Sequence, residues 1–316
     1  ERNLSRIKMQ GIIYRDRERK VVDIVKSFLR SAVFYRQLYK NYQRNSLKFD
    51  DLQKLVDDRG GSLLFNLKKD CHALFRGNDA SMEEEKLFDL AISSIFHEAM
   101  IIRENCYQLE VYRPKVVLLE KKSQKTVHEG RLLKELNRAL SKANKRLSQE
   151  LKETHDLVND ALEQLRELLK SYAKNGLLIR FLLENEGLVE EAYGQGGLKN
   201  IFSSIYKEGW LEALLIAGAS YCKSGYYEKA SETTKKALAL RYSDDIRFLH
   251  LFYSGLRDYY DGNLSKALEN LKAAKELGKN LPNMEEYLEK MESIFNTIMV
   301  AQKGIQLGQE SSSSLL

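Results

Sequence analysis

Two stretches decide the fold: residues 214–240 read LLIAGASYCKSGYYEKASETTKKALAL, and residues 251–277 read LFYSGLRDYYDGNLSKALENLKAAKEL. They align at an offset of 37 residues, and small residues recur at the same places, with Gly218, Gly225, Ala230 and Ala237 repeated as Gly255, Gly262, Ala267 and Ala274. The second glycine of each set is expected to end a helix, because glycine adopts positive φ without a steric penalty. The other small residues let two helices approach closely. Each stretch therefore predicts a helix, a tight turn and a second helix.

This pattern resembles the tetratricopeptide repeat, a family of helix-turn-helix units of about 34 residues. The resemblance covers about residues 211–281, less than a quarter of the chain, and Tyr221 and Tyr227 add to the glycines and alanines of the first unit. The second unit departs at Asp258, where the family usually has an aromatic residue, and Pro282 follows near the family's terminal proline position. The resemblance implies a short α-solenoid over 176–302, with a degenerate first hairpin within 177–209 and a capping helix at about 284–302.

The resemblance also implies a concave groove lined by the first helix of each unit. The family's groove positions fall on Glu212, Leu215, Ala219, Cys222 and Lys223 in the first unit and on Leu249, Phe252, Leu256, Tyr259 and Tyr260 in the second. Family members that bind acidic chaperone tails use a clamp of Lys, Asn and Arg there, but Leu215 and Ala219 occupy two of those places. This departure favours an apolar, aromatic groove suited to a partner helix or apolar peptide. The alternative is that the chain's own helices cover this face.

The N-terminal part carries apolar stripes at helical spacing. One stripe runs from Val21 to Tyr42 within a helix predicted for about 12–44, and a second runs from Phe88 to Leu109. The second helix is predicted to reach about Tyr112, where Pro114 breaks or kinks it. Smaller features are helices at about 47–58 and 62–76, a break between them at Gly60-Gly61, a C-cap at Gly77, and a capping box formed by Ser81 and Glu84.

A longer seam runs from Leu133 to Tyr172 and predicts one helix over about 127–173. Apolar residues alternate at spacings of three and four except at 143, 147 and 151, where two successive fours indicate a stutter in a coiled-coil-like seam. A helix of about 45 residues reaches roughly 65–70 Å, so it must pack on the N-terminal helices or on another chain. We therefore expect a helical bundle over 1–125, a long helix over 126–175, helical repeats over 176–302 and a flexible tail over 303–316.

The composition supports an all-α protein. The 316 residues include only 2 prolines, whereas average usage predicts about fifteen, and helix interiors exclude proline. Hydrophobic residues make up 43% of the chain, which excludes an intrinsically disordered class. The chain begins at Glu1 without a methionine, which indicates a fragment boundary and leaves open a signal segment before it.

Charge alternates along the chain in blocks of +9 over 1–48, −6 over 49–112, +8 over 113–152 and −5 over 153–316. Several basic residues fall off the apolar stripes, Lys121, Lys122 and Lys125 among them. The candidate anion-binding residues are Arg15, Arg17, Arg19, Lys20, Lys142, Lys145 and Arg146. Such faces suit phosphate or an anionic membrane. They equally suit solvated helices, or basic helices packed beside the acidic block.

The sequence contains no readable catalytic chemistry, and no catalytic residue, metal ligand or cofactor is predicted. Phosphate-binding glycine motifs and the Glu-x-x-His pattern of helical di-iron sites do not occur. Cys71-His72 does not form a nucleophile pair, because adjacent helical residues point about 100° apart. The three cysteines are far apart and predict reduced thiols in a cytoplasmic protein, and no apolar run is long enough to predict a transmembrane segment.

These observations favour a non-catalytic scaffold or adaptor that binds a protein partner through the groove, with the long helix used for spacing or for a homo-oligomer. The alternatives are a basic helical nucleic-acid-binding protein and a helical protein associated with a membrane surface. A helical enzyme with an unrecognised site is a further, weaker hypothesis.

Overall fold

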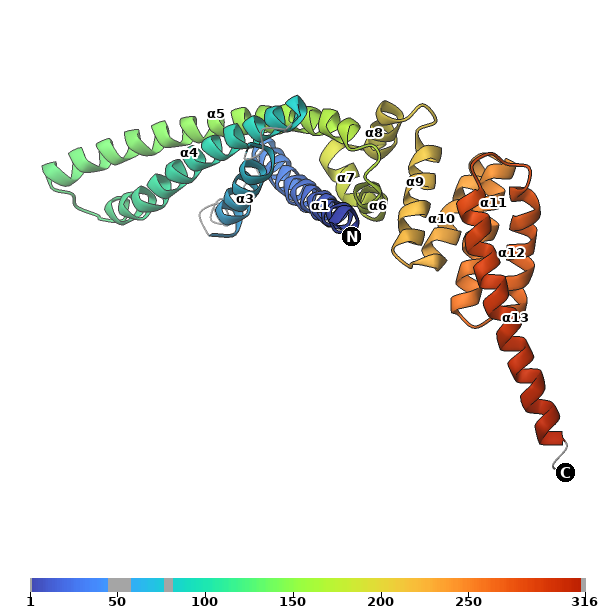
Figure 1. The fold of residues 1–316 in the computed structure, drawn as a ribbon. Helices are drawn as coiled ribbons and strands as arrows, with labels where there is room; N and C mark the ends of the chain where they lie inside the picture. Colours follow the sequence, from blue (N-terminus) through green and yellow to red (C-terminus); the bar gives the residue numbers. More distant parts are fainter. Residues whose placement is uncertain (1, 45–57, 77–81, 314–316) are drawn as a thin grey trace. The chain divides into compact units, whose positions relative to one another are not determined.

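The computed structural model describes the backbone of residues 2–44, 58–76 and 82–313, and the side chains of 16–44, 63–76 and 82–300. Within these ranges nearly every residue is helical and no β-strand occurs, which confirms the predicted all-α class. The chain forms two compact units, Glu1–Ile201 and Phe202–Leu316 (Figure 1). The boundary between the two units therefore lies C-terminal to the domain boundary predicted between residues 175 and 176.

The N-terminal unit is built on three helices whose apolar stripes meet. α1 (Arg2–Gln43), α4 (Glu83–Glu120) and α5 (Val127–Ser171) are the long ones, and α3 (Asp58–Cys71) continues into the π-helical turn η1 (His72–Arg76). The predicted stripe of α4 is buried at each of its seven positions from Phe88 to Leu109. Phe88 packs edge-on against Phe28 of α1, with ring centroids 5.1 Å apart, and Phe75 of η1 lies 6.4 Å away. Each side chain of this size stabilises the fold by about 1.5–3 kcal/mol through burial.

Two predicted helix boundaries in this unit are wrong. Gly60 and Gly61 lie inside α3 instead of separating two helices, and α4 continues through Pro114 to Glu120. Pro114 is exposed, and its nitrogen cannot donate to the carbonyl of Glu110 one turn earlier. Val116, buried two residues later, adds packing energy that favours continued helix. The predicted helix at 47–58 lies outside the described residues except for its last position, and so do Gly77 and Ser81.

α5 confirms the predicted long helix and shows what its seam packs against. The seam positions from Leu136 to Leu168 are largely buried, and the stutter residues Ala143, Leu147 and Leu151 are all among them. α5 packs along α4 and also against α1, so its apolar stripe is used within its own chain (Figure 1). α6 (Gly176–Glu184) and α7 (Glu186–Tyr193) pack on α1 as well. The two helices expected to begin the repeats therefore belong to the N-terminal unit.

The C-terminal unit contains two helical hairpins with matching turns. α9 (Trp210–Lys223) pairs with α10 (Tyr227–Leu240), and α11 (Asp244–Tyr260) pairs with α12 (Leu264–Gly278); α8 (Gly197–Ile205) precedes them. Gly225 and Gly262 both have φ +81°, as predicted. The backbone hydrogen bonds also correspond: Tyr226 N donates to Tyr221 O (3.0 Å) and Asn263 N to Asp258 O (2.7 Å). The offset of 37 residues thus relates two turns of the same geometry.

Close helix contacts account for the other small residues of the repeat. A Cβ built on Gly255 would lie 2.6 Å from Leu271 of α12, and one built on Gly218 would lie 3.2 Å from Thr234 of α10. The four alanines shared by the two stretches are completely buried. Asp258, the departure from the resembled family, is buried with Arg257 Nη2 at 2.7 Å and accepts a hydrogen bond from Asn270 Nδ2 at 2.8 Å.

α13 (Glu285–Ser313) follows the hairpins and covers part of α11. Tyr287 stands edge-on against Phe248 and Phe252, with ring centroids 5.6 and 5.2 Å apart, and Met291 and Ile298 are completely buried. This agrees with the predicted capping helix at about 284–302. The helix continues to Ser313, into the segment for which the sequence predicts a flexible tail.

Candidate functional site

The predicted groove positions of the second repeat are partly covered by the chain itself. Phe252 is 1% exposed and Leu256 0% exposed, and the ring of Tyr287 from α13 packs on Phe252. Leu249 and Tyr259 are half-buried, and Tyr260 is 61% exposed. For Phe252 and Leu256 the alternative interpretation therefore holds, because these two side chains belong to the core of the unit and cannot contact a partner.

The first repeat keeps a more accessible face on α9. Glu212, Leu215, Ala219 and Cys222 are half-buried, and Lys223 is exposed. Leu215, Ala219 and Lys223 are four residues apart, so they follow one face of the helix toward the turn at Gly225. Burial raises the pKa of the Cys222 thiol, while the nearby ammonium groups of Lys290 and Lys223 act in the opposite direction. A raised pKa leaves little thiolate, so Cys222 is a poor nucleophile.

Tyrosine side chains gather at the end of the two hairpins where the glycine turns lie. Tyr227 and Tyr260 stack with ring centroids 4.7 Å apart and planes at 6°, and Tyr259 meets Tyr260 edge-on at 5.1 Å. We call Tyr227, Tyr259 and Tyr260 the tyrosine cluster. Burial, and secondarily a hydrogen bond with Tyr260, raises the pKa of Tyr227 to about 12, so the Tyr227 phenol stays uncharged at neutral pH. Its neighbour in the first turn, Tyr226, is 55% exposed.

Sequence reasoning found only part of the tyrosine cluster. The resemblance implies Tyr259 and Tyr260 as groove residues, but it does not indicate the contribution of Tyr227. The signal was the offset itself, because the turns at Gly225 and Gly262 place the start of α10 beside the end of α11. One pair of tyrosines directly follows Gly225, and another pair precedes Gly262 with Asp261 between them, and this arrangement marks such a cluster.

Arg17, a candidate anion-binding residue, is held inside the N-terminal unit. Its Nη2 lies 2.7 Å from Oε1 and 2.9 Å from Oε2 of Glu85, a completely buried carboxylate at the start of α4. Tyr172 donates a further hydrogen bond to Glu85, and the backbone N–H of Met82 donates to the other oxygen at 3.2 Å. An adjacent cleft of about 250 Å³ is lined by the same groups. An anion entering it would meet the Glu85 carboxylate, so Arg17 serves the fold.

The remaining candidate anion-binding residues are dispersed. Lys20 and Arg19 are exposed on α1, and Lys20 Nζ lies 2.9 Å from Asp16, one turn earlier. The side chain of Arg15 lies outside the described residues. The three basic residues predicted on the long helix are all exposed, namely Lys142, Lys145 and Arg146. Arg19 and Lys20 therefore lie on the surface of α1, and Lys142, Lys145 and Arg146 form a basic surface on α5.

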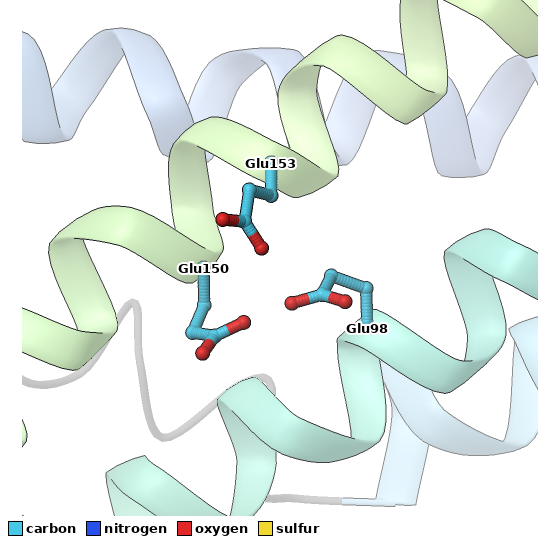
Figure 2. A group of neighbouring side chains, drawn as sticks. All are labelled: Glu98, Glu150 and Glu153. Atoms are coloured by element: carbon cyan, nitrogen blue, oxygen red, sulfur yellow. The ribbon is translucent and has the colours of Figure 1, made fainter.

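The structure brings three glutamates together that sequence reasoning did not select. Glu98 projects from α4 toward Glu150 and Glu153 of α5, and the nearest carboxylate oxygens lie within 4.8 Å of one another (Figure 2). Burial raises the pKa of Glu98 to about 7, and a hydrogen bond that its protonated form donates to Glu150 and the two neighbouring charges add to the effect. Glu150 and Glu153 form an i, i+3 pair visible in the sequence, but Glu98 is distant along the chain and meets them only through helix packing.

Two chemical states would relieve the charge repulsion among these three glutamates. Carboxylate oxygens are the preferred ligands of hard divalent cations, so these are residues that could hold one. A proton shared between Glu98 and Glu150 relieves the same repulsion without a ligand. The raised pKa of Glu98 makes the shared proton available near neutral pH.

The Cys71-His72 pair does not form a nucleophilic site. Cys71 is completely buried, and burial together with nearby Asp89 raises the pKa of its thiol. Asp89, also completely buried, lies 2.7 Å from Nε of Arg76 and 4.0 Å from Nδ1 of His72. The carboxylate is therefore paired with an arginine of η1, and the thiol is unreactive.

Comparison of the chain with protein-family models, with curated proteins and with solved structures gives no match. Within the described residues, no helix is both long enough and apolar enough to cross a membrane. The candidate sites therefore stand on their geometry alone.

Proposed function

We propose that this chain is a non-catalytic protein-protein interaction scaffold that binds a partner helix or apolar peptide through its C-terminal unit. The contact surface consists of the tyrosine cluster and the face of α9 that carries Leu215, Ala219 and Lys223. One observation carries the proposal: stacked, accessible tyrosines are held on a frame of two helical hairpins with equal turns. Tyrosine supplies a large contact area at low conformational cost and is enriched at the energetic centres of protein interfaces.

The resemblance to the tetratricopeptide repeat supports the same function, because members of that family bind partners through the first helix of each unit. Two of the predicted groove positions are buried and so are not available to a partner. Tyr287 of α13 covers Phe252, and Leu256 is completely buried, so a partner contacts the remaining face of α9 and the end of the hairpins. The mixture of aliphatic, aromatic and single basic side chains there suits an apolar peptide with an acidic residue.

A cytoplasmic location belongs to this proposal. Cys71, Cys106 and Cys222 are free thiols in the structure, and Cys71 and Cys106 are buried in the core. Free, widely spaced cysteines are typical of a reducing compartment.

Affinity purification with the full chain as bait tests the proposal. The bait with Tyr259→Ala and Tyr260→Ala should lose the partners that the unchanged chain retains. Tyr242→Ala is the matched control, because Tyr242 is 72% exposed and lies in the connection between α10 and α11, at the opposite end of the hairpins. This binding surface would be rejected if the double variant and the unchanged chain recovered partners equally and circular dichroism showed that both are folded.

A further inference from the structure

The last turns of α4 and the first turns of α5 form a hairpin tip with very little core. Between residues 113 and 142, a fully described range, only Val116 and Leu136 are buried. Figure 1 shows the two helices continuing side by side to their connection at residues 121–126. We call residues 115–134 the hairpin tip. Because only two helices pair here, most of their side chains face outward.

Aliphatic side chains are exposed at the extreme end of this hairpin tip. Val127, the first residue of α5, is 77% exposed, and Leu118, in the last turn of α4, is 67% exposed. Val117 and Leu132 follow at 42% and 38%. Single exposed apolar residues are ordinary on protein surfaces, but four at one end of a protruding hairpin form a surface that would gain free energy by leaving water.

Basic residues surround these aliphatic side chains. The hairpin tip holds six basic and two acidic residues, a net charge of +4. One of the two acids, Glu129, is already engaged: Lys122 Nζ lies 2.5 Å from its Oε1, and the Thr126 backbone N–H donates to its Oε2 at 2.9 Å. These bonds hold the Glu129 pKa at about 2, so the carboxylate stays charged and paired. The field of the hairpin tip is therefore positive.

The connection itself is ordered by its own hydrogen bonds. Thr126 caps α5, because its Oγ1 accepts from Glu129 N at 3.2 Å, and Lys125 Nζ donates to the carbonyl oxygens of Lys122 and Glu120 at 3.2 and 3.5 Å. These bonds satisfy backbone groups that a helix end leaves open. A surface that is already ordered loses little conformational entropy when it binds.

We propose that the hairpin tip docks on an anionic lipid bilayer, with Leu118 and Val127 entering the headgroup region and the lysines contacting the lipid phosphates. Basic residues near such a surface contribute about 1 kcal/mol each, and apolar side chains add the energy of leaving water. A second copy of this chain does not fit, because two hairpin tips of like charge repel. A nucleic acid would account for the lysines alone, since residues 115–134 contain no Phe, Tyr or Trp on which bases could stack.

Vesicle flotation of the full chain tests this proposal. The unchanged protein should float with phosphatidylcholine vesicles that contain about 30% phosphatidylserine, and not with pure phosphatidylcholine, and binding should weaken as salt rises. The triple variant Lys115→Gln, Lys121→Gln, Lys134→Gln should bind about a hundredfold more weakly. Replacing Leu118 and Val127 by Gln should weaken binding at least about tenfold.

Matched variants separate the hairpin tip from general charge and apolarity. Lys235→Gln, Lys236→Gln and Lys272→Gln remove three exposed lysines of the C-terminal unit, and Leu240→Gln with Val300→Gln removes two exposed aliphatic side chains there. Neither set should change flotation. Equal binding to neutral vesicles overturns the proposal, and so does unchanged binding by the Leu118 and Val127 variant. The proposal is also overturned if the protein binds a DNA duplex or single-stranded RNA more tightly than vesicles and the Leu118 and Val127 variant binds the nucleic acid equally well. That result would assign the hairpin tip to nucleic acid.

Discussion

Substituting Gly255 by alanine places a methyl carbon 2.6 Å from both Cγ and Cδ2 of Leu271 and 3.3 Å from its backbone nitrogen. Non-bonded carbon atoms normally lie about 3.5–4.0 Å apart, so the completely buried Leu271 must move by about 1 Å. At the equivalent position Gly218, the nearest atom is Thr234 Cγ2 at 3.2 Å. There a shift of about a few tenths of an ångström suffices.

Two opposing free-energy terms give the expected sizes. An alanine in a helix interior is more favourable than glycine by about 1 kcal/mol, and overpacking a core costs about 1–3 kcal/mol. The short contact at Gly255 involves a branch carbon and the backbone, so the overpacking cost lies in the upper half of that range. After the gain of about 1 kcal/mol in helix propensity is subtracted, Gly255→Ala should destabilise the unit by about 1–2 kcal/mol. At Gly218 the terms nearly cancel, and the free energy of unfolding should change by less than about 0.5 kcal/mol.

The chain's only tryptophan, Trp210 at the start of α9, reports on the unit that carries both glycines. Urea unfolding followed by Trp210 fluorescence should show the lower stability of Gly255→Ala. The same substitution in a Leu271→Ala background should instead stabilise by about 1 kcal/mol, because the clash is gone and the helix propensity remains. Equal losses for Gly255→Ala in both backgrounds would refute the packing of α11 against α12 described above.

Three further substitutions test other contacts. Arg17→Met should destabilise the N-terminal unit by about 3–5 kcal/mol in urea unfolding monitored by circular dichroism, because it leaves the buried Glu85 carboxylate without its cation; a loss below about 1 kcal/mol would contradict a buried pair. Glu98 has a pKa of about 7 when folded against 4.5 ordinarily, so the folded state holds an extra proton between these values and loses stability as pH rises through them. Glu98→Gln should therefore stabilise the protein at pH 8 more than at pH 5, whereas the exposed Glu104→Gln should show no such difference in urea titrations. Phe252→Ala should lower the free energy of unfolding by about 3–5 kcal/mol, as measured by Trp210 fluorescence. A near-neutral result would indicate that Phe252 lies in an accessible groove.

The sequence allowed prediction of features that depend on residues close along the chain. The glycine turns follow from two positions that need positive φ, and the buried stripe of α4 follows from spacing alone. The buried seam of α5, with Ala143, Leu147 and Leu151 in it, also follows from spacing, because a heptad-like pattern does not depend on what the helix meets. Propensity at a single residue was less reliable: Pro114 costs helix stability locally, but the packing of α4 on α5 outweighs it.

Features that depend on distant contacts could not be predicted. The sequence predicts a capping helix at about 284–302, but it does not show that Tyr287 of this helix will cover Phe252, since that contact depends on the path of the chain after α12. The role of Arg17 is similar, because a basic residue off an apolar stripe looks solvated until Glu85 is placed opposite it. The meeting of Glu98 with Glu150 also requires the register of α4 against α5, which the stripes restrict to a face but do not fix along the helix axis.

Photo-crosslinking at Tyr260 tests the central claim, that the tyrosine cluster contacts a protein partner, most directly. A photoreactive phenylalanine analogue replaces Tyr260 in one chain and Tyr242 in the other, and both are irradiated in cells. Both positions are well exposed, at 61% and 72%, and lie at opposite ends of the same hairpins. We expect a discrete protein adduct from position 260 that is absent from position 242. Identical adduct patterns from the two positions, or no adduct from position 260, would contradict the claim.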